Sequence, residues 1–391
     1  MSDRHGFATR CLHAGEAPDP STGAHGVPMY GNVTYAFRSF EQIEAMAEGR
    51  APHFTYSPRG NPTVRSLELK MADLEGAERS IAAASGMAAI APTLVSLARD
   101  GGHIVAAKQV YHLSGDILDR LLPSFGASAT RVDLSDEAAV RAAIGEQTRA
   151  IYAEPVSNPS LEVADLPMLS AIARDAGIPL VVDNTFLSPA LLRPIELGAD
   201  LVIHSATKYL SGLGQVQGGF VSGPAARLDA IREQMIVFGG QMPPFSGWLL
   251  LQGMKTLPMR MRTHCDNAAR LAALLAAHPA VASVHYPGLA GHPGHAVAAR
   301  DLASGFGGMI SFSLHGGRSP KAAFLNALEL ATLAVSLGDV TTLVWPWSDI
   351  DLIRVSVGVE DGDDLERDFR RGLDAALAAL SPDLAPAAAA V

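Results

Sequence analysis

The chain has 391 residues, of which 48% are hydrophobic and 18% are charged, and its formal net charge is −10. This composition is typical of a globular protein, and the acidic balance argues against a nucleic-acid surface, which requires clustered basic residues. The length favours two domains over a single simple core.

The two cysteines, Cys11 and Cys265, lie far apart and form neither a disulfide framework nor a metal-binding pattern. His285, His292 and His295 lie in a segment rich in proline and glycine, which predicts a surface loop and no bound metal. The N-terminus lacks the apolar core of a signal peptide, and no apolar run reaches the ~18 residues that a membrane helix needs. We therefore expect a protein of the reducing cytoplasm, without a membrane partner.

The first part of the chain, residues 1–53, has scattered proline, glycine and aromatic residues and predicts an irregular N-terminal arm. Such an arm has little core of its own, so we expect it to pack on something else, for example another subunit. From about residue 62 to 240, amphipathic segments alternate with short apolar runs.

This alternation predicts an α/β fold whose mostly parallel sheet is covered by helices on both faces. The helices are expected at 65–74, 87–97, 113–122, 137–144 and 167–175. The strands are expected at 80–83, 103–106, 129–132, 150–152, 179–182 and 201–203. Ligands of such sheets bind at the carboxyl ends of the strands.

The remainder of the chain predicts a second domain. Residues 244–277 predict a long helix, bent at Pro258, that leads into it. There we expect strands at 309–314 and 352–357, and helices at 322–330 and 364–380. We therefore expect an arm at 1–53, a large domain at 54–246, a small domain at 247–381 and a disordered tail at 382–391.

The pairing of Lys208 with Asp183 is the strongest chemical signal in the chain. Lys208 follows one predicted strand, in Ser205–Tyr209, and precedes a glycine-rich loop, and Asp183 directly follows another strand. Pyridoxal phosphate (PLP) needs a lysine that forms a Schiff base with its aldehyde and a carboxylate that keeps its ring nitrogen protonated. An acid after a strand is as often a helix cap, but beside Lys208 we favour a cofactor site.

Hydroxyl and glycine residues suited to a phosphate lie close to these two. Ser85-Gly86-Met87 opens a predicted helix after an apolar run, where backbone N–H groups bind phosphate and Gly86 permits close approach. Ser205 and Thr207 add hydroxyl donors. By itself the motif at 85–87 is a weak signal.

Three further residues are candidates with competing structural explanations. Tyr111 follows the third apolar run and can stack on a flat ring, although a core aromatic residue would show the same pattern. Asn158 precedes Pro159 in a sequence that is also typical of a turn. Arg354 interrupts a strand pattern, and a buried arginine requires an anion such as a substrate carboxylate.

Together these motifs resemble the Cys/Met-metabolism family of PLP enzymes, which includes cystathionine γ-synthase, cystathionine γ- and β-lyases, methionine γ-lyase and O-acylhomoserine sulfhydrylases. The resemblance covers nearly the whole chain. Its segments are Phe7–Arg10, Pro18–Gly23, Gly60–Thr63, Ser85–Ile90, Val182–Thr185, Ser205–Lys208, Tyr286–Leu289, Phe306–Ser311, Ser336–Gly338 and Arg354–Asp361.

The resemblance implies a fold-type I architecture and a homotetramer built from two catalytic dimers. It implies that Lys208 carries the Schiff base, that Asp183 meets the ring nitrogen, and that Tyr111 stacks on the ring and takes part in proton transfer. For the cofactor phosphate, the implied contacts are Ser85, Gly86, Met87, Ser205 and Thr207.

The resemblance also implies contacts to the substrate and between subunits. Arg354 would bind the substrate α-carboxylate, helped by Ser336. Asn158 would contact the ring hydroxyl and the substrate. Tyr56 would reach the phosphate and the substrate of a neighbouring subunit.

The chain departs from the family pattern at several places, two of which concern the phosphate and the pocket wall. Pro58 stands where the family usually has a phosphate-binding arginine, and Arg59 comes one place later. Either the backbone near Pro58 turns Arg59 back to the phosphate, or the phosphate has one partner fewer. A family segment before Arg354 is missing, so that Trp345 and Trp347 are expected to reshape the pocket wall.

We therefore predict γ-replacement on an O-acyl-L-homoserine, ahead of γ-elimination of the cystathionine or methionine γ-lyase kind. A non-sulfur γ-leaving group stays open because residues of the sulfur pocket are altered, and Thr341 also stands where several relatives carry glutamate. β-Elimination from cystathionine is a further open alternative. The alternative of another class is a PLP-fold protein that has lost catalysis and serves as a binding module, which only Pro58 supports. The expected small-molecule partner is an amino acid.

Overall fold

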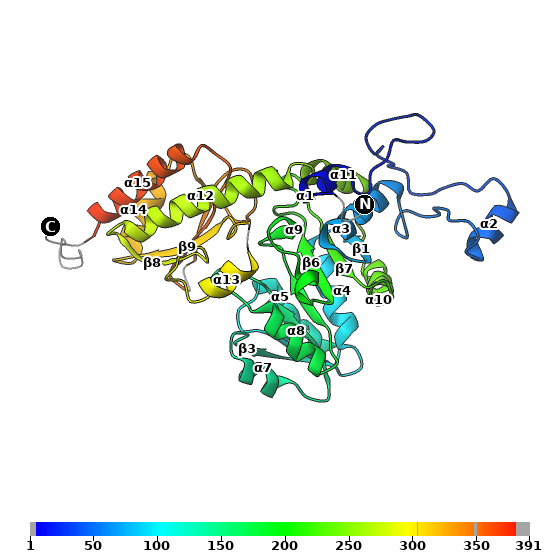
Figure 1. Ribbon diagram of the computed structural model, residues 1–391, viewed down its shortest axis with the longest axis horizontal. Coiled ribbons are helices and arrows are strands. Elements are labelled where there is room, and N and C mark those ends of the chain that lie inside the picture. The colour runs from blue at the N-terminus through cyan, green and yellow to red at the C-terminus, as the bar shows by residue number, and fades with distance from the viewer. Residues whose placement is uncertain (1–4, 303, 348–349, 381–391) are drawn as a thin grey trace.

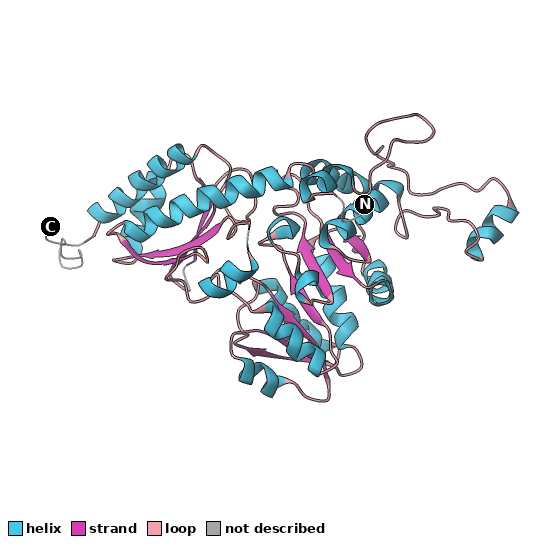
Figure 2. Cartoon of the chain, viewed as in Figure 1, coloured by secondary structure: helices cyan, strands magenta, loops and turns pink. Residues whose placement is uncertain are grey.

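The computed structural model describes residues 5–302, 304–347 and 350–380. A seven-stranded sheet with its helices occupies the middle of the molecule, and a five-stranded sheet lies toward one end (Figure 1). The N-terminal arm projects at the other end. Figure 2 shows the magenta strands of the larger sheet enclosed by cyan helices.

The larger sheet has the strand order β1-β7-β6-β5-β4-β2-β3. Among its described strands, β7 alone runs antiparallel to its neighbours. The predicted α/β class with a mostly parallel sheet is therefore confirmed. The bounds are β1 Arg79–Ala83, β2 His103–Ala107, β3 Ser128–Val132, β4 Thr148–Ala153, β5 Leu180–Asp183, β6 Leu201–Ser205 and β7 Gly219–Gly223.

Helices cover both faces of this sheet, as the continuous apolar strands predict. In β4, Ile151 packs into a core cluster with α3 and α8, whereas Tyr152 packs into a second cluster with α4 and α10. The bounds are α3 Pro62–Glu75, α4 Gly86–Ala98, α5 His112–Asp116, η1 Ile117–Leu121, α6 Leu122–Ser124, α7 Glu137–Ala143, α8 Leu166–Asp175, α9 Ser188–Leu191, η2 Pro194–Leu197 and α10 Ala225–Val237. The predicted helix at 113–122 is divided by the π-helical turn η1.

The smaller sheet has the strand order β10-β11-β12-β9-β8 and packs through Phe312 and Ile353 against α12, α14 and α15. Its strands are β8 Val281–His285, β9 Met309–Leu314, β10 Thr332–Leu333, β11 Leu343–Trp347 and β12 Leu352–Ser356. Its helices are α13 His295–Asp301, α14 Arg318–Ala327 and α15 Gly362–Ala378. The helix predicted at 322–330 begins four residues earlier and ends at Ala327.

The long helix predicted at 244–277 is two helices, α11 Pro244–Met254 and α12 Leu257–Ala277. Pro258 lies in the first turn of α12, where its missing N–H costs no helical hydrogen bond. It therefore begins a helix and does not bend one. No helix among the described residues is long and apolar enough to cross a membrane.

The N-terminal arm is more regular than predicted, because it contains α1 Phe7–His13 and α2 Phe40–Ala47. Helix α1 is fixed to the body, since the buried Lys70 pairs with Glu16 and donates to the carbonyl of Cys11. Helix α2 has no buried residue and lies away from the body (Figure 1). The tail expected at 382–391 lies outside the described residues.

Candidate active site

A cavity of about 660 Å³ lies where β4, β5 and β6 end and α4 begins. Asp183 is the last residue of β5 and Ser205 the last of β6, as expected for a ligand site in a parallel sheet. The opposite wall comes from β11, β12 and the segment 335–337. The lining residues used below are Ser85, Gly86, Met87, Tyr111, His112, Glu154, Asn158, Asp183, Thr185, Ser205, Thr207, Lys208, Gln217, Val335, Ser336, Leu337, Trp345, Trp347 and Arg354.

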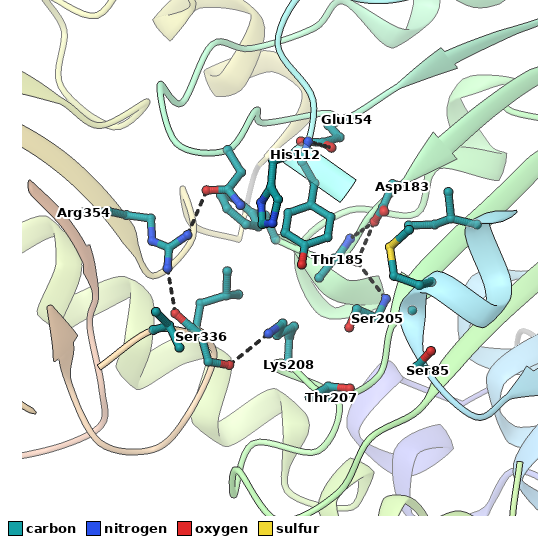
Figure 3. Close-up of a pocket in the computed structure, with 18 of the residues that line it drawn as sticks. Ser85, His112, Glu154, Asp183, Thr185, Ser205, Thr207, Lys208, Ser336 and Arg354 are labelled. Carbon is teal, nitrogen blue, oxygen red and sulfur yellow. Dashed lines mark hydrogen bonds between the residues drawn. The ribbon is translucent and has the colours of Figure 1, made fainter. Parts of the chain in front are cut away.

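Lys208 lies in a turn after β6 and points into this cavity (Figure 3). Its Nζ donates a hydrogen bond to Ser336 Oγ at 2.9 Å. Burial and the charge of Arg354 lower the pKa of Lys208. A larger share of the lysine is therefore neutral at a given pH than in water, and the neutral amine is the form that acts as a nucleophile or a base.

Asp183 is buried at the edge of the cavity, and its Oδ1 accepts both the backbone N–H and the hydroxyl of Thr185. These bonds form a local turn, so Asp183 does not cap a helix. Oδ2 lies 3.4 Å from the hydroxyl of Tyr152 and is the oxygen left for a ligand. Burial raises the pKa of Asp183, and the Thr185 bonds oppose that rise.

Glu154, which the sequence analysis missed, is a second buried carboxyl in the cavity wall. Its Oε1 accepts the backbone N–H of Tyr111 at 2.6 Å. Burial and the charge of Asp183 raise the pKa of Glu154 to about 8. Its position after β4 parallels that of Asp183 at the end of β5, which is the signal that could have identified it.

The residues predicted for a phosphate meet at the start of α4. Ser85 caps this helix, and its Oγ accepts the N–H of Ala88 at 3.1 Å. A Cβ at Gly86 would lie 2.7 Å from Ser205 Cβ, so only glycine fits there. Thr207 Oγ1 accepts the N–H of Gly218 at 3.1 Å. Met87 completes this corner of the cavity.

Arg354 lies in β12 on the opposite side of the cavity from Asp183 (Figure 3). It is 6% exposed, and burial lowers its pKa to about 10. Its Nη1 donates to Asn158 Oδ1 at 2.9 Å and its Nη2 to the carbonyl of Ser336 at 2.8 Å. Because both acceptors are uncharged, neither neutralises the positive charge of the guanidinium, which can therefore bind an anion.

Tyr111 is half-buried in the cavity wall, and burial raises its pKa. Its ring centroid lies 4.6 Å from that of His112, which shares the wall. His112, Thr185 and Gln217 were not predicted as site residues. Thr185 follows β5, His112 begins α5 and Gln217 precedes β7, and sequence alone does not fix the direction of a side chain at such positions.

Tyr56 and Arg59 lie outside this cavity of their own chain. Tyr56 is 49% exposed, and Arg59 Nη1 lies 3.2 Å from Glu233 Oε1 on α10. The backbone does turn at Pro58, because the N–H of Arg59 donates to the carbonyl of Tyr56 at 2.9 Å. The turn directs the guanidinium to its own α10.

The histidine segment is not the surface loop that was predicted. His285 ends β8, His292 is buried, and His295 begins α13 with its Nδ1 on the carbonyl of Pro287 at 2.8 Å. Among the described residues, no cluster of three or more histidine, cysteine or acidic side chains could hold a metal ion.

The residues of this cavity fit PLP. Asp183 Oδ2 is available to a ring nitrogen and Lys208 to an aldehyde, and the start of α4 at Ser85–Met87 lines the cavity, where its N–H groups suit a phosphate. All three of these groups face a single cavity.

Comparisons with known proteins agree with this chemistry. The family model described as "Cys/Met metabolism PLP-dependent enzyme" matches residues 8–348. L-methionine γ-lyase of Pseudomonas putida is 42% identical over 390 residues, with 95% of this chain and 98% of the relative covered. O-succinylhomoserine sulfhydrylase of Pseudomonas aeruginosa is 38% identical over 386 residues, covering 94% of this chain and 95% of the relative.

Two further similarities concern cystathionine. Cystathionine γ-synthase of Mycobacterium leprae is 38% identical over 384 residues, covering 94% of this chain and 97% of the relative. The crystal structure of cystathionine γ-lyase from Lactobacillus plantarum complexed with L-serine matches with a TM-score of 0.88 and 36% identity, covering 95% of this chain and 99% of that one. The similar proteins therefore catalyse several different reactions.

Proposed function

We propose a reaction from one premise: the chain belongs to the Cys/Met-metabolism family of PLP-dependent enzymes. It is an enzyme of the trans-sulfuration type that uses PLP. The reaction we propose is γ-replacement on an O-acyl-L-homoserine, as in a cystathionine γ-synthase. The observation that carries this proposal is that Lys208, Asp183 and Arg354 line a single cavity.

When bound, PLP supplies an aldehyde that condenses with amines and a protonated ring that withdraws electrons from the substrate Cα. Asp183 would hold the ring nitrogen through Oδ2, since Thr185 occupies Oδ1. A carboxylate there keeps the nitrogen protonated. Gly86, Met87, Ser85, Ser205 and Thr207 would hold the phosphate.

Lys208 would move protons at the substrate Cα and Cβ once the substrate amine has displaced it. Its lowered pKa favours the neutral amine that accepts these protons. Ser336 joins the base to the substrate anchor, because its Oγ accepts from Lys208 and its carbonyl accepts from Arg354. A substrate that binds Arg354 therefore lies within reach of the lysine.

Arg354 would bind the substrate α-carboxylate with a guanidinium that Asn158 already orients. Tyr111 would stack on the cofactor ring, with its backbone fixed by Glu154. The contact with Arg354 would limit the orientations of the amino acid relative to Lys208, and the contact with Tyr111 would limit those of the cofactor ring.

We keep γ-elimination as a second candidate, because the relative with 42% identity is a methionine γ-lyase. In that reaction the γ-substituent leaves as a thiol, and water converts the remaining four-carbon unit into 2-oxobutanoate and ammonia, so that no thiol acceptor is needed. The binding-module alternative is not favoured, since the family and the named relatives are enzymes.

We also propose a homotetramer of two catalytic dimers, in which Tyr56 and Arg59 of one subunit reach the cofactor and substrate of another. The unburied α2 and the exposed Met29 and Val33 of the arm support it. Domains at 54–246 and 247–381 remain our proposal, with the boundary inside α11. The free, buried Cys11 and Cys265 support a reducing cytoplasm.

The test is an assay of the PLP-loaded protein with O-acetyl- or O-succinyl-L-homoserine, with and without L-cysteine, and with L-methionine or L-cystathionine alone. A thioether product that requires the thiol supports replacement, and 2-oxobutanoate without thiol supports elimination. Lys208→Ala is the matched control, since it removes the amine that the proposed reaction requires. Failure of all four substrates with a fully loaded protein overturns the proposal.

A further inference from the structure

Two tryptophans form one wall of the cavity beside Arg354. β11 and β12 pair antiparallel, with Trp345 opposite Arg354 and Trp347 opposite Leu352. Paired residues, and residues two apart in a strand, face the same side of a sheet. Trp345, Trp347 and Arg354 therefore share one face, and all three line the cavity. We call Trp345, Trp347, Val335 and Leu337 the tryptophan wall.

The tryptophan wall carries no charge of its own. The charged residue of this side is Arg354, whose guanidinium carbon lies 5.8 Å from the ring centroid of Trp347. The indole Nε1 of Trp347 is buried and has no hydrogen-bond partner among the described residues. The wall thus offers indole rings, aliphatic side chains and one neutral donor.

The other ionisable groups of the cavity are already committed to the cofactor or to its surroundings. Asp183 lies across the cavity from Arg354 (Figure 3), Glu154 accepts the N–H of Tyr111, Lys208 donates to Ser336, and His112 adjoins Tyr111. A substrate α-carboxylate would neutralise Arg354. No further cation of the wall would then remain, within the described chain, for a second anionic group.

We propose that the tryptophan wall selects substrates whose γ-substituent carries no charge. The class comprises acetyl esters and S-alkyl thioethers, and it disfavours succinyl esters. The inference rests on the proposed function, because it assumes that Arg354 holds the α-carboxylate. Its physical basis is that a charged group against indole rings loses hydration without gaining a partner.

A matched pair of unreactive ligands tests this selection without turnover. L-Norleucine and L-2-aminoadipate have the same chain length and differ in a terminal methyl against a terminal carboxylate. Neither carries a γ-leaving group. We expect the PLP-loaded protein to bind norleucine about 100-fold more tightly. Equal binding, or tighter binding of aminoadipate, would overturn the proposal.

Indole fluorescence can report this binding directly. The chain has three tryptophans, and Trp248→Phe leaves Trp345 and Trp347 as the only emitters. Trp248 lies on α11, outside the cavity lining. Norleucine should change the emission of this variant at saturation. Calorimetry gives the norleucine concentration that saturates the protein. Unchanged indole emission at that concentration would show that the norleucine side chain binds away from Trp345 and Trp347, and would refute the proposal.

Substitutions in the tryptophan wall should change the preference between the two ligands without changing the binding of PLP. Trp345→Ala and Trp347→Ala should each reduce the norleucine preference about tenfold, with the PLP absorption band retained. Trp345→Arg should favour aminoadipate, since it places a cation beside Arg354. Trp345→Phe should keep the preference. Loss of selection in Arg59→Ala but in none of the tryptophan variants would assign it to the arm and overturn the proposal.

The two proposals can fail separately. Turnover of O-succinyl-L-homoserine as efficient as that of the O-acetyl ester would refute the tryptophan wall and leave γ-replacement standing. Selective binding of norleucine without turnover of any γ-substituted substrate would support the wall and refute the proposed reaction.

Discussion

Replacing Glu154 with glutamine is expected to make the PLP-free protein relatively more stable at alkaline pH. Glu154 and Asp183 are buried at the carboxyl ends of the neighbouring strands β4 and β5. Glu154 Oε1 accepts the N–H of Tyr111 at 2.6 Å. Glutamine keeps an oxygen for this bond and removes the charge.

The magnitude follows from the pKa of Glu154, which burial and the charge of Asp183 raise from 4.5 to about 8. A carboxyl whose pKa is raised by folding stabilises the protein fully below its ordinary pKa, and this contribution is lost as the pH rises toward the folded value. The pKa difference between the folded and the unfolded protein corresponds to about 5 kcal/mol in the free energy of unfolding. About 2 kcal/mol of this is lost between pH 6 and 8. Glu154→Gln removes this loss.

Urea unfolding of the PLP-free protein at pH 6, 7 and 8, followed by circular dichroism, measures the effect. The wild-type midpoint should fall relative to the Glu154→Gln midpoint as the pH rises. Glu146→Gln, at an exposed glutamate of the same body, should follow the wild type. A constant difference between wild type and Glu154→Gln from pH 6 to 8 would refute the reasoning.

Four other predictions concern the cofactor and the substrate. Lys208→Ala should abolish the absorption band at ~420 nm that borohydride removes from the wild type, and a retained band contradicts the Schiff base. Arg354→Lys should raise KM roughly 10- to 100-fold in initial-rate assays, because lysine lacks the planar fork; an unchanged KM excludes the carboxylate contact. Arg59→Ala should raise the Kd of PLP in equilibrium dialysis, and an unchanged Kd shows that this residue does not replace the missing arginine. Gly86→Ala should raise the same Kd at least about tenfold, since its Cβ would collide with Ser205; normal PLP retention would contradict the cradle.

The parallel strands were predictable because both faces of the sheet are buried. The apolar runs at 103–106 and 179–182 were located to within a residue or two of β2 and β5. Such runs require no alternation of polar residues, and the amphipathic segments between them match the helices that cover the sheet.

Four strands, β7, β8, β10 and β11, were not predicted, and two of them have a local reason. β7 begins and ends with glycine, which predicts a loop, yet a Cβ at Gly219 would lie 2.3 Å from the carbonyl oxygen of Ser85. The close packing of β7 on the start of α4 therefore requires a glycine at position 219. The same glycine makes the sequence of the strand look like that of a loop. β11 contains Pro346, which usually argues against a strand.

The site was predictable where chemistry requires a residue type after a strand, as for Asp183 and Lys208. Glu154 occupies an equivalent position after β4. The role of an acidic residue there cannot be predicted until the structure shows that it lies near Asp183. The roles proposed for Tyr56 and Arg59 require a neighbouring subunit, so neither the sequence nor a single chain fixes their surroundings.

The division of the cavity between two sheets has a consequence for how such a protein can evolve. Lys208 and Asp183 belong to the larger sheet and its loops, whereas Arg354, Trp345 and Trp347 belong to the smaller one. With the roles proposed above, a mutation in the smaller sheet would alter which leaving group is accepted, while Lys208 and Asp183 stay in place. New substrate specificities could therefore evolve by single substitutions in the smaller sheet, while the residues contributed by the larger sheet stay unchanged.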